Sequence, residues 1–461
     1  MNQAAAFIPK TPDIPPPFDH QRESVEFYTS APHVFNMSDP GSGKTRAWLD
    51  WFAAHRDSGG GAGLVLCPKS IMTAAWENDA RKYTPHLRVS VATAERRRDA
   101  LKPGADLYVL NHDAVRALIK EPKLLPAGVD AFNIDESTAF KRATSQRSKA
   151  AFKLLKPFER RVIMSGTPAP QGVLDLWHQA LIVDLGERLG TSYFKFRQTV
   201  CDPIQVGPHQ NHVKWEEKPG ALDAVIDLIS DITLRYKLED CIDMPDRVEY
   251  FVDFPLSPKH RQQYTELKDQ ALLMFKTGNY IDAIHAASMR IKLLQLLSGA
   301  VYDSQRVAQS INTDRYNLVI DLVEQREASL VAFMFTHQRD ALIDEAKKRG
   351  LRYGLIDGSV PGNERSAVVD RFQAGHLDVI FAHPASAGHG LTLTRASAVI
   401  WASPTDNAEH WTQFNARIYR AGQTKRTEII KVIARDTIEE KAFDNLTRKL
   451  TNQEALLEML T

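Results

Sequence analysis

A glycine-rich stretch near the start of the chain has the residue types that bind phosphate groups. It reads Pro40-Gly41-Ser42-Gly43-Lys44-Thr45 and follows a short apolar run. Glycines let backbone N–H groups close on phosphate oxygens, and a helix that begins at the loop adds its positive end. We expect Lys44 to contact the β and γ phosphates of a nucleotide and the Thr45 hydroxyl to ligate Mg²⁺. Ser38 stands where the strict pattern has glycine. The alternative interpretation of the whole stretch is a surface turn that precedes a helix.

An acidic pair, Asp135-Glu136, directly follows the apolar run Phe132-Asn133-Ile134. We expect Asp135 to hold Mg²⁺, usually through water, and Glu136 to polarise the attacking water. By itself an acidic dipeptide is more often a solvated strand end. Together with the glycine-rich loop, the pair predicts a site that hydrolyses a nucleoside triphosphate.

Two further motifs carry groups suited to a phosphate. The turn Ser165-Gly166-Thr167-Pro168 has small hydroxyl residues that can sense the γ-phosphate, although a plain turn reads the same way. Gln413, Arg417 and Arg420 are spaced to share one helical face, and paired arginines suit an arginine finger. A solvated basic helix face is the alternative for this second motif.

Bulk composition excludes several classes of protein. The 461 residues suggest two to three domains, and 43% hydrophobic with 25% charged residues is ordinary for a soluble globular protein. The net charge of +1 means that a nucleic-acid role must rest on local patches. The 3 distant cysteines fit no disulfide framework. We expect a cytoplasmic protein without a signal peptide or membrane span.

Short, nearly continuous apolar runs alternate with helix-like segments, which predicts an α/β fold with buried, mainly parallel sheets. The runs fall into two series and therefore predict two lobes. The first series is Val34–Met37, Leu64–Cys67, Leu107–Leu110, Phe132–Ile134 and Val162–Met164, and the second is Leu330–Phe335, Tyr353–Ile356, Val379–Ala382, Ala398–Trp401 and Glu428–Val432. Helices are expected over His260–Leu297, Arg339–Arg349, Glu364–Gln373 and Thr437–Leu460.

These patterns divide the chain into four parts. Residues 1–17 are proline-rich and are expected to form a flexible arm. Residues 18–248 form the first, ATP-binding lobe, residues 249–436 the second lobe, and residues 437–461 a C-terminal helix. In open α/β sheets ligands bind outside the carboxyl ends of the strands, where the polar motifs lie.

The order of the motifs resembles the superfamily-two helicases, and within them the Swi/Snf-type DNA translocases. The order is GSGKT, the acidic pair, SGTP, then SAGHGLTLT with Gly390, and QFNARIYRAGQ. Phe18-Asp19-His20-Gln21 is similar to the family's Q motif, in which Gln21 would read adenine. LVLCPKSIMTAAWENDARKY (Leu64–Tyr83) is similar to motif Ia. The likeness covers almost the whole chain.

The resemblance implies two RecA-like lobes with ATP in the cleft between them and duplex DNA bound across both. It implies that the C-terminal helix packs back on the first lobe, and that closing and opening of the lobes moves the protein along the duplex. The stretch ASPTDNAEHWTQ departs from the pattern, since relatives carry aromatics at Thr405 and Asp406. With no large insertion or histone-reading module, the chain fits a compact phage or bacterial member that acts as a monomer.

The same resemblance supplies candidate nucleic-acid contacts, which are Lys69, Ser70, Asn111, His112, Lys141, Arg142, Thr336, His337 and Thr392. Lysine, arginine, small hydroxyls and backbone N–H groups contact phosphates rather than base edges, so little sequence specificity is expected. The run Arg96-Arg97-Arg98 is basic enough to contact nucleic acid, but it is equally well explained as a solvated helix face. Trp215 lies in a region, 202–220, that is expected to form a small β element, which either wedges against a duplex or caps the sheet.

Other functions remain open on the sequence alone. A strand-separating DNA or RNA helicase is the nearest alternative to a duplex-DNA translocase. A nucleic-acid-binding scaffold with weak ATPase activity is the second. A P-loop kinase or GTPase would leave the second lobe unexplained.

Overall fold

The computed structural model describes residues 14–155, 157–205, 212–276, 283–303, 305, 307–387 and 390–458. The described residues form two compact units, the first made of 14–168 and 173–237 and the second of 169–172 and 238–458. Among them, no helix combines the length and the apolar character needed to cross a membrane.

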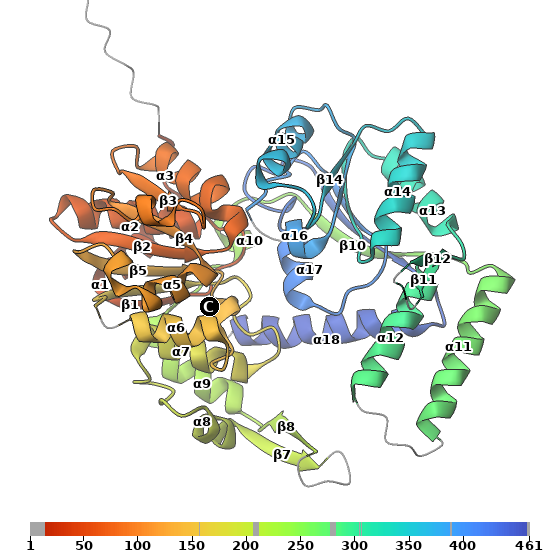
Figure 1. Ribbon diagram of the computed structural model, residues 1–461, viewed down its shortest axis with the longest axis horizontal. Helices are drawn as coiled ribbons and strands as arrows, with labels where there is room; N and C mark the ends of the chain where they lie inside the picture. Colours follow the sequence, from red (N-terminus) through yellow and green to blue (C-terminus); the bar gives the residue numbers. More distant parts are fainter. Residues whose placement is uncertain are drawn as a thin grey trace, which may run out of the picture. The chain divides into compact units, whose positions relative to one another are not determined.

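A fully parallel sheet forms the centre of the first unit, which is drawn from red to yellow-green in Figure 1. In the described residues its strand order is β3-β4-β2-β5-β6-β1-β9. The strands are β1 (His33–Asn36), β2 (Ala62–Cys67), β3 (Val89–Ala92), β4 (Leu107–Asn111), β5 (Val129–Asp135), β6 (Arg160–Met164) and β9 (Thr233–Leu234). Because all neighbours run parallel, the carboxyl ends of these strands meet at one edge. The five predicted strands are confirmed; β3 and β9, at the two margins of the sheet, carry too weak an apolar signal to be predicted.

Helices cover both faces of this sheet, which is why its strands are continuously apolar. On one face α1 (Asp19–Ser30) and α2 (Lys44–Asp57) pack together, and Trp48 joins Trp76 and Val65 in a buried cluster. On the other face α7 (Leu176–Asp184) contacts β1 and β6, and all of its residues are buried. The remaining helices of eight or more residues in this unit are α6 (Gln146–Leu154), α8 (Tyr193–Val200) and α9 (Ala221–Ile229).

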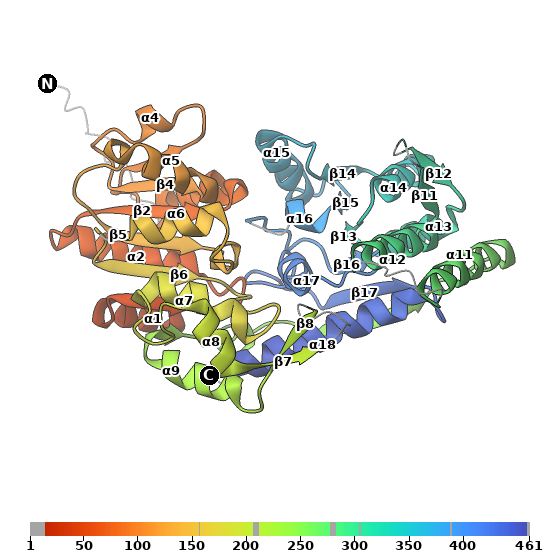
Figure 2. The same cartoon turned by 60° about the horizontal axis from the view of Figure 1, so that its bottom comes forward.

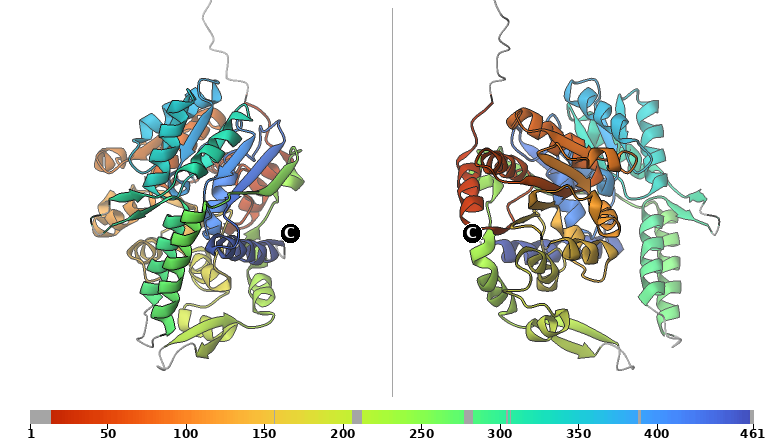
Figure 3. Two further views of the ribbon diagram at one scale, coloured as in Figure 1. Left: turned by 90° about the vertical axis from the view of Figure 1, so that its right-hand side faces the viewer. Right: turned by 60° about the vertical axis from the view of Figure 1, so that its left-hand side comes forward.

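An antiparallel hairpin follows α8 and consists of β7 (Cys201–Gln205) and β8 (Val213–Glu217). It extends from the first unit beside α8, as the right-hand view of Figure 3 shows. The guanidinium of Arg197 lies 4.0 Å from the ring centre of Trp215 and so ties β8 to α8. The small β element expected at 202–220 is therefore present, with residues 206–211 outside the described part.

A second parallel sheet forms the centre of the other unit. Among the described residues its order is β10-β17-β16-β13-β15-β14, and every neighbouring pair is parallel. The strands are β10 (Arg247–Asp253), β13 (Ser329–Ala332), β14 (Tyr353–Ile356), β15 (Val379–Ala382), β16 (Ala398–Trp401) and β17 (Thr427–Ile433). A separate antiparallel pair joins β11 (Ala300–Tyr302) to β12 (Ala308–Ser310). The five predicted strands are confirmed, whereas β10 was missed because it is an edge strand with alternating exposed residues.

Alternate residues of these strands face opposite helical layers, as the period of two requires. Val331 and Ile400 pack with α13 (Asp314–Glu324) and α14 (Thr336–Lys348). Leu330 and Trp401 pack with the other layer, which is α15 (Gly362–Gln373), α17 (Ala408–Asn415) and the first half of α18 (Ile438–Glu458). Two mainly parallel sheets, each flanked by helices, confirm the predicted α/β class and the two RecA-like lobes.

Helices α11 (Pro258–Lys276) and α12 (Ala283–Leu297) lie side by side in the second unit (Figures 1 and 3). They occupy the stretch predicted as helical over 260–297. The long helix α18 contacts α12 and α17 within the same unit (Figure 2), where Phe443 and Leu446 enter the core. Its predicted packing on the first lobe stays a prediction.

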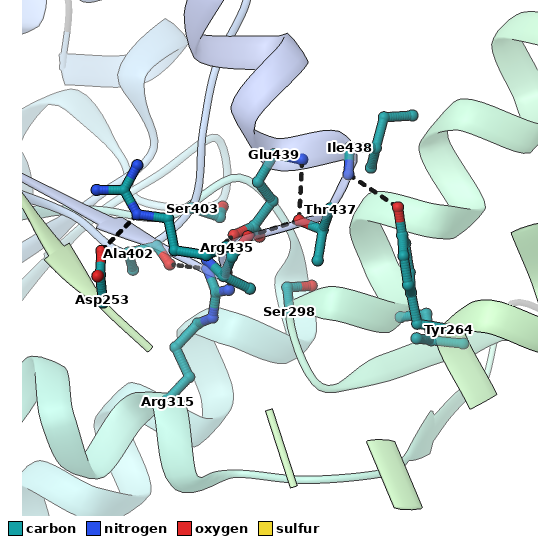
Figure 4. A network of polar contacts seen from close by, with 12 residues as sticks. Asp253, Tyr264, Ser298, Arg315, Ala402, Ser403, Arg435, Thr437, Ile438 and Glu439 are labelled. Atoms are coloured by element: carbon teal, nitrogen blue, oxygen red, sulfur yellow. Dashed lines mark hydrogen bonds and ion pairs between the residues drawn. The ribbon is translucent and has the colours of Figure 1, made fainter. Parts of the chain in front are cut away.

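A buried polar network fixes the start of α18 (Figure 4). Arg315 donates to a carboxylate oxygen of Glu439 at 2.8 Å and to the carbonyl oxygen of Ala402 at 3.0 Å. The same carboxylate oxygen accepts the N–H of Ala434 at 2.7 Å. The network therefore joins α13, the end of β16 and the first turn of α18 in the interior.

Candidate nucleotide and nucleic-acid sites

The glycine-rich loop predicted to bind phosphate connects β1 to the first residue of α2. Gly41 and Gly43 have φ angles of 87° and 81°, in the left-handed region that favours glycine. A Cβ atom on Gly43 would also meet the side-chain amide of Gln21, which would have to move. Ser38 has a negative φ, and its Oγ accepts the N–H of Tyr236 at 3.1 Å. The position that departs from the strict pattern therefore has no need of glycine.

Lys44 folds back over this loop. Its Nζ donates to the carbonyl oxygens of Ser38 at 2.7 Å and Asp39 at 2.9 Å. Burial lowers the pKa of Lys44, and the nearby carboxylates of Glu136 and Asp135 oppose that shift. A half-buried ammonium group at a helix start suits a phosphate.

The hydroxyl of Ser42 gives a second sign that the loop is built for a ligand. Its Oγ is buried and has no hydrogen-bond partner among the described residues. Buried polar groups are almost always paired, so an unpaired one in a glycine-rich loop fits a bound phosphate. Pro40 and Thr45 complete the loop around it. These residues fit a nucleotide.

Gln21 and His20, both buried in α1, contact the same carbonyl oxygen of the loop. Nε2 of His20 lies 2.7 Å from the oxygen of Ser42, and Nε2 of Gln21 donates to it at 3.5 Å. The His20 ring lies near Phe18 at 5.8 Å and Tyr236 at 5.6 Å between ring centres. Gln21 is predicted from the sequence, whereas the contact of His20 emerges only from the structure; its place in the same motif is the signal that could have indicated it.

The acidic pair lies at the end of β5. Burial, followed by the charge of Glu136, raises the pKa of Asp135 to about 6, and Lys44 opposes the rise. Glu136 has φ 53° and ψ 55°, a left-handed conformation rare for this residue type and frequent at functional sites. Oxygen donors from Asp135 and Thr45 are of the kind that Mg²⁺ prefers, so the donor set fits this ion.

The turn after β6 packs directly on the loop. A Cβ atom on Gly166 would lie 2.5 Å from Cδ of Pro40. The hydroxyl of Thr138, two residues after the acidic pair, lies 2.7 Å from Oγ of Ser165 and donates to the carbonyl oxygen of Thr167 at 2.9 Å. The turn therefore contacts both the phosphate-binding loop and the segment that carries the carboxylates.

The arginines of the second unit require a correction. Gln413 lies on α17, but this helix ends at Asn415, so Arg417 and Arg420 share no helical face with it. The N–H groups of Arg417 and Ile418 bond to carbonyls three residues back, which tightens the chain into turns. The fold still gathers the two arginines, because both donate to the carbonyl oxygen of Leu391, at 3.3 and 3.0 Å.

Two contacts extend this cluster. Gly390, with φ 70°, directly precedes Leu391, so the predicted motif V residue lies beside the arginines along the chain. Nε of Arg417 donates to the carbonyl oxygen of Gln413 at 2.7 Å. Gln413 and Arg417 are buried, and Arg420 is partly exposed.

The nucleic-acid candidates of the first unit lie at the same sheet edge as the loop. Lys69 and Ser70 follow β2, Asn111 is the last residue of β4, and His112 follows it. Lys69 is exposed, whereas His112 is buried with its Nε2 2.8 Å from the carbonyl oxygen of Asp135. In the sheet, β4 and β2 lie beside β5 in the order β4-β2-β5. The nucleic-acid candidates are therefore neighbours of the acidic pair along one edge of the sheet.

The other nucleic-acid candidates differ in accessibility. Lys141 pairs with Asp175 at 3.0 Å and is largely covered, while Arg142 is exposed. In the second unit Thr336 and Thr392 are exposed. His337 turns inward: its Nε2 lies 2.8 Å from Oγ of Ser298, and burial lowers its pKa to about 4.

Comparisons with known proteins identify the family of this chain. The model of the SNF2-related domain matches residues 20–299, and that of the helicase conserved C-terminal domain matches residues 314–422. The chain is 29% identical over 418 residues to protein p41 of Acyrthosiphon pisum secondary endosymbiont phage 1, covering 86% of this chain and 88% of that protein. It is 24% identical over 446 residues to the chromodomain-helicase-DNA-binding protein 1-like of Danio rerio, covering 91% of this chain but 41% of that protein. A solved structure of the Sulfolobus solfataricus SWI2/SNF2 ATPase core in complex with dsDNA aligns with TM-score 0.45 and 22% identity, covering 96% of this chain and 94% of that one.

Proposed function

This chain belongs to the SNF2-related family, and we propose that it is an ATP-dependent translocase on double-stranded DNA. It is an ATP hydrolase of the nucleic-acid-dependent, helicase-like type. One observation carries the proposal. The candidate nucleotide residues at the ends of β1, β5 and β6 and the candidate DNA contacts at the ends of β2 and β4 share one sheet edge of the first lobe.

In the first lobe, each nucleotide residue has a distinct task. The loop around Gly41 and Gly43 would bind the phosphates through N–H groups, and Lys44 would contact the β and γ phosphates. Mg²⁺, when bound through Thr45 and Asp135, neutralises phosphate charge. Glu136 would accept a proton from the attacking water. Gln21 would read the adenine ring.

In the second lobe, Arg417 and Arg420 would stabilise the charge that develops on the transferred phosphoryl group. Their shared contact with the Leu391 carbonyl holds the two guanidinium groups together. Gln413, next to them on α17, would orient the γ-phosphate or water. We propose that both lobes act on one nucleotide, so that its hydrolysis is coupled to lobe movement.

Duplex DNA as the track is supported by the chemistry of the candidate contacts. Lys69, Arg142, Thr336 and Thr392 are exposed lysine, arginine and hydroxyl groups, which contact phosphates without reading bases. The Danio rerio relative is named a DNA-binding helicase, which also supports DNA. Binding would therefore depend strongly on salt and little on sequence.

The decisive experiment measures ATP turnover against single-stranded DNA, duplex DNA, forked DNA, duplex RNA and RNA–DNA hybrid. We expect duplex DNA to stimulate ATP turnover most. The Lys44→Ala substitution should abolish ATP turnover. Absence of stimulation by any DNA would refute the motor function and would favour a scaffold with weak ATPase activity.

A second assay separates translocation from unwinding. The protein is expected to displace the third strand of a triplex while leaving a forked duplex paired. Unwinding of the fork would instead indicate a strand-separating helicase, and stimulation by duplex RNA alone would indicate an RNA-directed relative.

A further inference from the structure

Trp76 contacts the carboxylate proposed to hold the metal. Its indole Nε1 donates to Oδ2 of Asp135 at 3.0 Å, and the tryptophan is completely buried. The two residues are 59 positions apart in the chain, so only the fold brings them together. An indole N–H is a donor without acceptor capacity and carries no charge at any physiological pH.

The remaining oxygen of Asp135 is also held. Its Oδ1 accepts the backbone N–H of Glu136 at 2.9 Å, and the carbonyl oxygen of the same aspartate lies 2.8 Å from Nε2 of His112. One donor on each carboxylate oxygen fixes the plane of the group. Trp76 supplies the donor that comes from a distant part of the chain, whereas the Glu136 N–H is adjacent in sequence.

The segment that carries Trp76 is distorted in a way that favours a specific role. Met72–Glu77 forms a π-helix, a rare geometry that is frequently found at functional sites. The short helix Lys69–Ile71 directly precedes it and contains Lys69, a candidate DNA contact. The Trp76 ring also packs edge-on against Trp48, with 5.4 Å between ring centres.

We infer that Trp76 is a positioning residue for Asp135, holding its carboxylate in the orientation that accepts the Mg²⁺–nucleotide complex. The inference rests on the proposed nucleotide site but not on DNA as the track. Partners that orient a metal-binding group usually change metal affinity by about 10- to 100-fold when they are removed.

The test is Trp76→Phe, which removes the N–H donor and keeps an aromatic ring in the core. The protein is titrated with a fluorescent ATP analogue, once with Mg²⁺ and once with EDTA, in the absence of DNA. We expect nucleotide affinity in EDTA to be unchanged and the gain in affinity caused by Mg²⁺ to fall about tenfold. In turnover assays, excess Mg²⁺ should restore kcat, because only the apparent KM for the metal is raised.

Trp48→Phe is the matched control. Trp48 is equally buried and lies in the same aromatic cluster, but its Nε1 has no hydrogen-bond partner among the described residues. The Trp48→Phe variant should therefore keep the full gain in nucleotide affinity that Mg²⁺ causes. If Trp76→Phe also keeps that gain, or if both variants lose it equally, the inference is wrong.

A second variant covers the case in which Trp76→Phe fails to fold. Site-specific replacement of Trp76 by benzothienylalanine puts sulfur in place of the N–H and keeps the ring shape. It should reduce the gain from Mg²⁺ by the same factor, and an unchanged gain would overturn the inference. Failure of the proposed function would appear differently, as a wild-type protein whose turnover no nucleic acid stimulates.

Discussion

Arg315 and Glu439 form an ion pair in the interior of the second lobe, with side-chain exposures of 1% and 0% (Figure 4). The pair joins α13 to the first turn of α18, and the Ala402 carbonyl and the Ala434 N–H satisfy further groups around it. Taking two charges out of water is costly, and such a pair is stable only when both partners are present.

Glu439→Gln should destabilise the second lobe by about 3–5 kcal/mol, because the Arg315 charge stays buried without its counter-charge. Urea unfolding of the full chain measures the change in free energy. Glu327→Gln is the control: its pair with Lys425 has exposures of 64% and 43%, so we expect no measurable loss of stability. Equal losses in both variants would show that burial of the pair is unimportant.

Glu136→Gln should stop hydrolysis while ATP still binds, since only the proton-accepting group is lost. We expect kcat to fall by about 100-fold or more, with nucleotide affinity within about twofold of wild type. Phosphate release and nucleotide titration measure the two quantities. The exposed residue Glu121 offers a control, because Glu121→Gln should leave both unchanged. Normal turnover in Glu136→Gln would assign the water-polarising role elsewhere.

Arg420→Ala should lower kcat by about 1,000-fold or more, because a guanidinium that stabilises transition-state charge is lost. Arg420→Lys should not restore turnover, since an ammonium lacks the planar fork of donors. Arg448, an exposed arginine on α18, provides the control substitution Arg448→Ala. If the Arg420→Ala variant turns over ATP at the normal rate, Arg420 does not act as an arginine finger.

Acidification should weaken the second lobe through His337. Burial lowers the pKa of His337 from its ordinary value of 6.5 to about 4, so the unfolded chain binds a proton at a pH where the folded lobe does not. The contribution of neutral His337 to the free energy of unfolding is therefore complete above pH 6.5. It is lost as the pH falls toward 4, by about 3 kcal/mol in all. Unfolding free energies of wild type and His337→Gln, compared across this range, should converge on acidification. Parallel curves would contradict the assignment.

Much of the fold follows from local patterns. Strands such as Val379–Ala382 and Ala398–Trp401 were placed with the bounds that the structure gives them, because strands buried on both faces are continuously apolar. The edge strand Arg247–Asp253 escaped the same argument, since its alternate residues are exposed and the others are only partly buried. The end of α17 at Asn415 was also missed, because tight turns continued the spacing of a helix.

The sequence by itself determined the chemistry of the nucleotide loop, the acidic pair and the two-lobed α/β fold, because these depend on neighbouring residues and short periodicities. Only the tertiary structure decided which distant side chains meet. Trp76 reaches Asp135 across 59 positions, and Arg315 reaches Glu439 across 124. Periodicity reports which face of an element is buried, but the order of strands and the packing of helices decide which partner that face contacts.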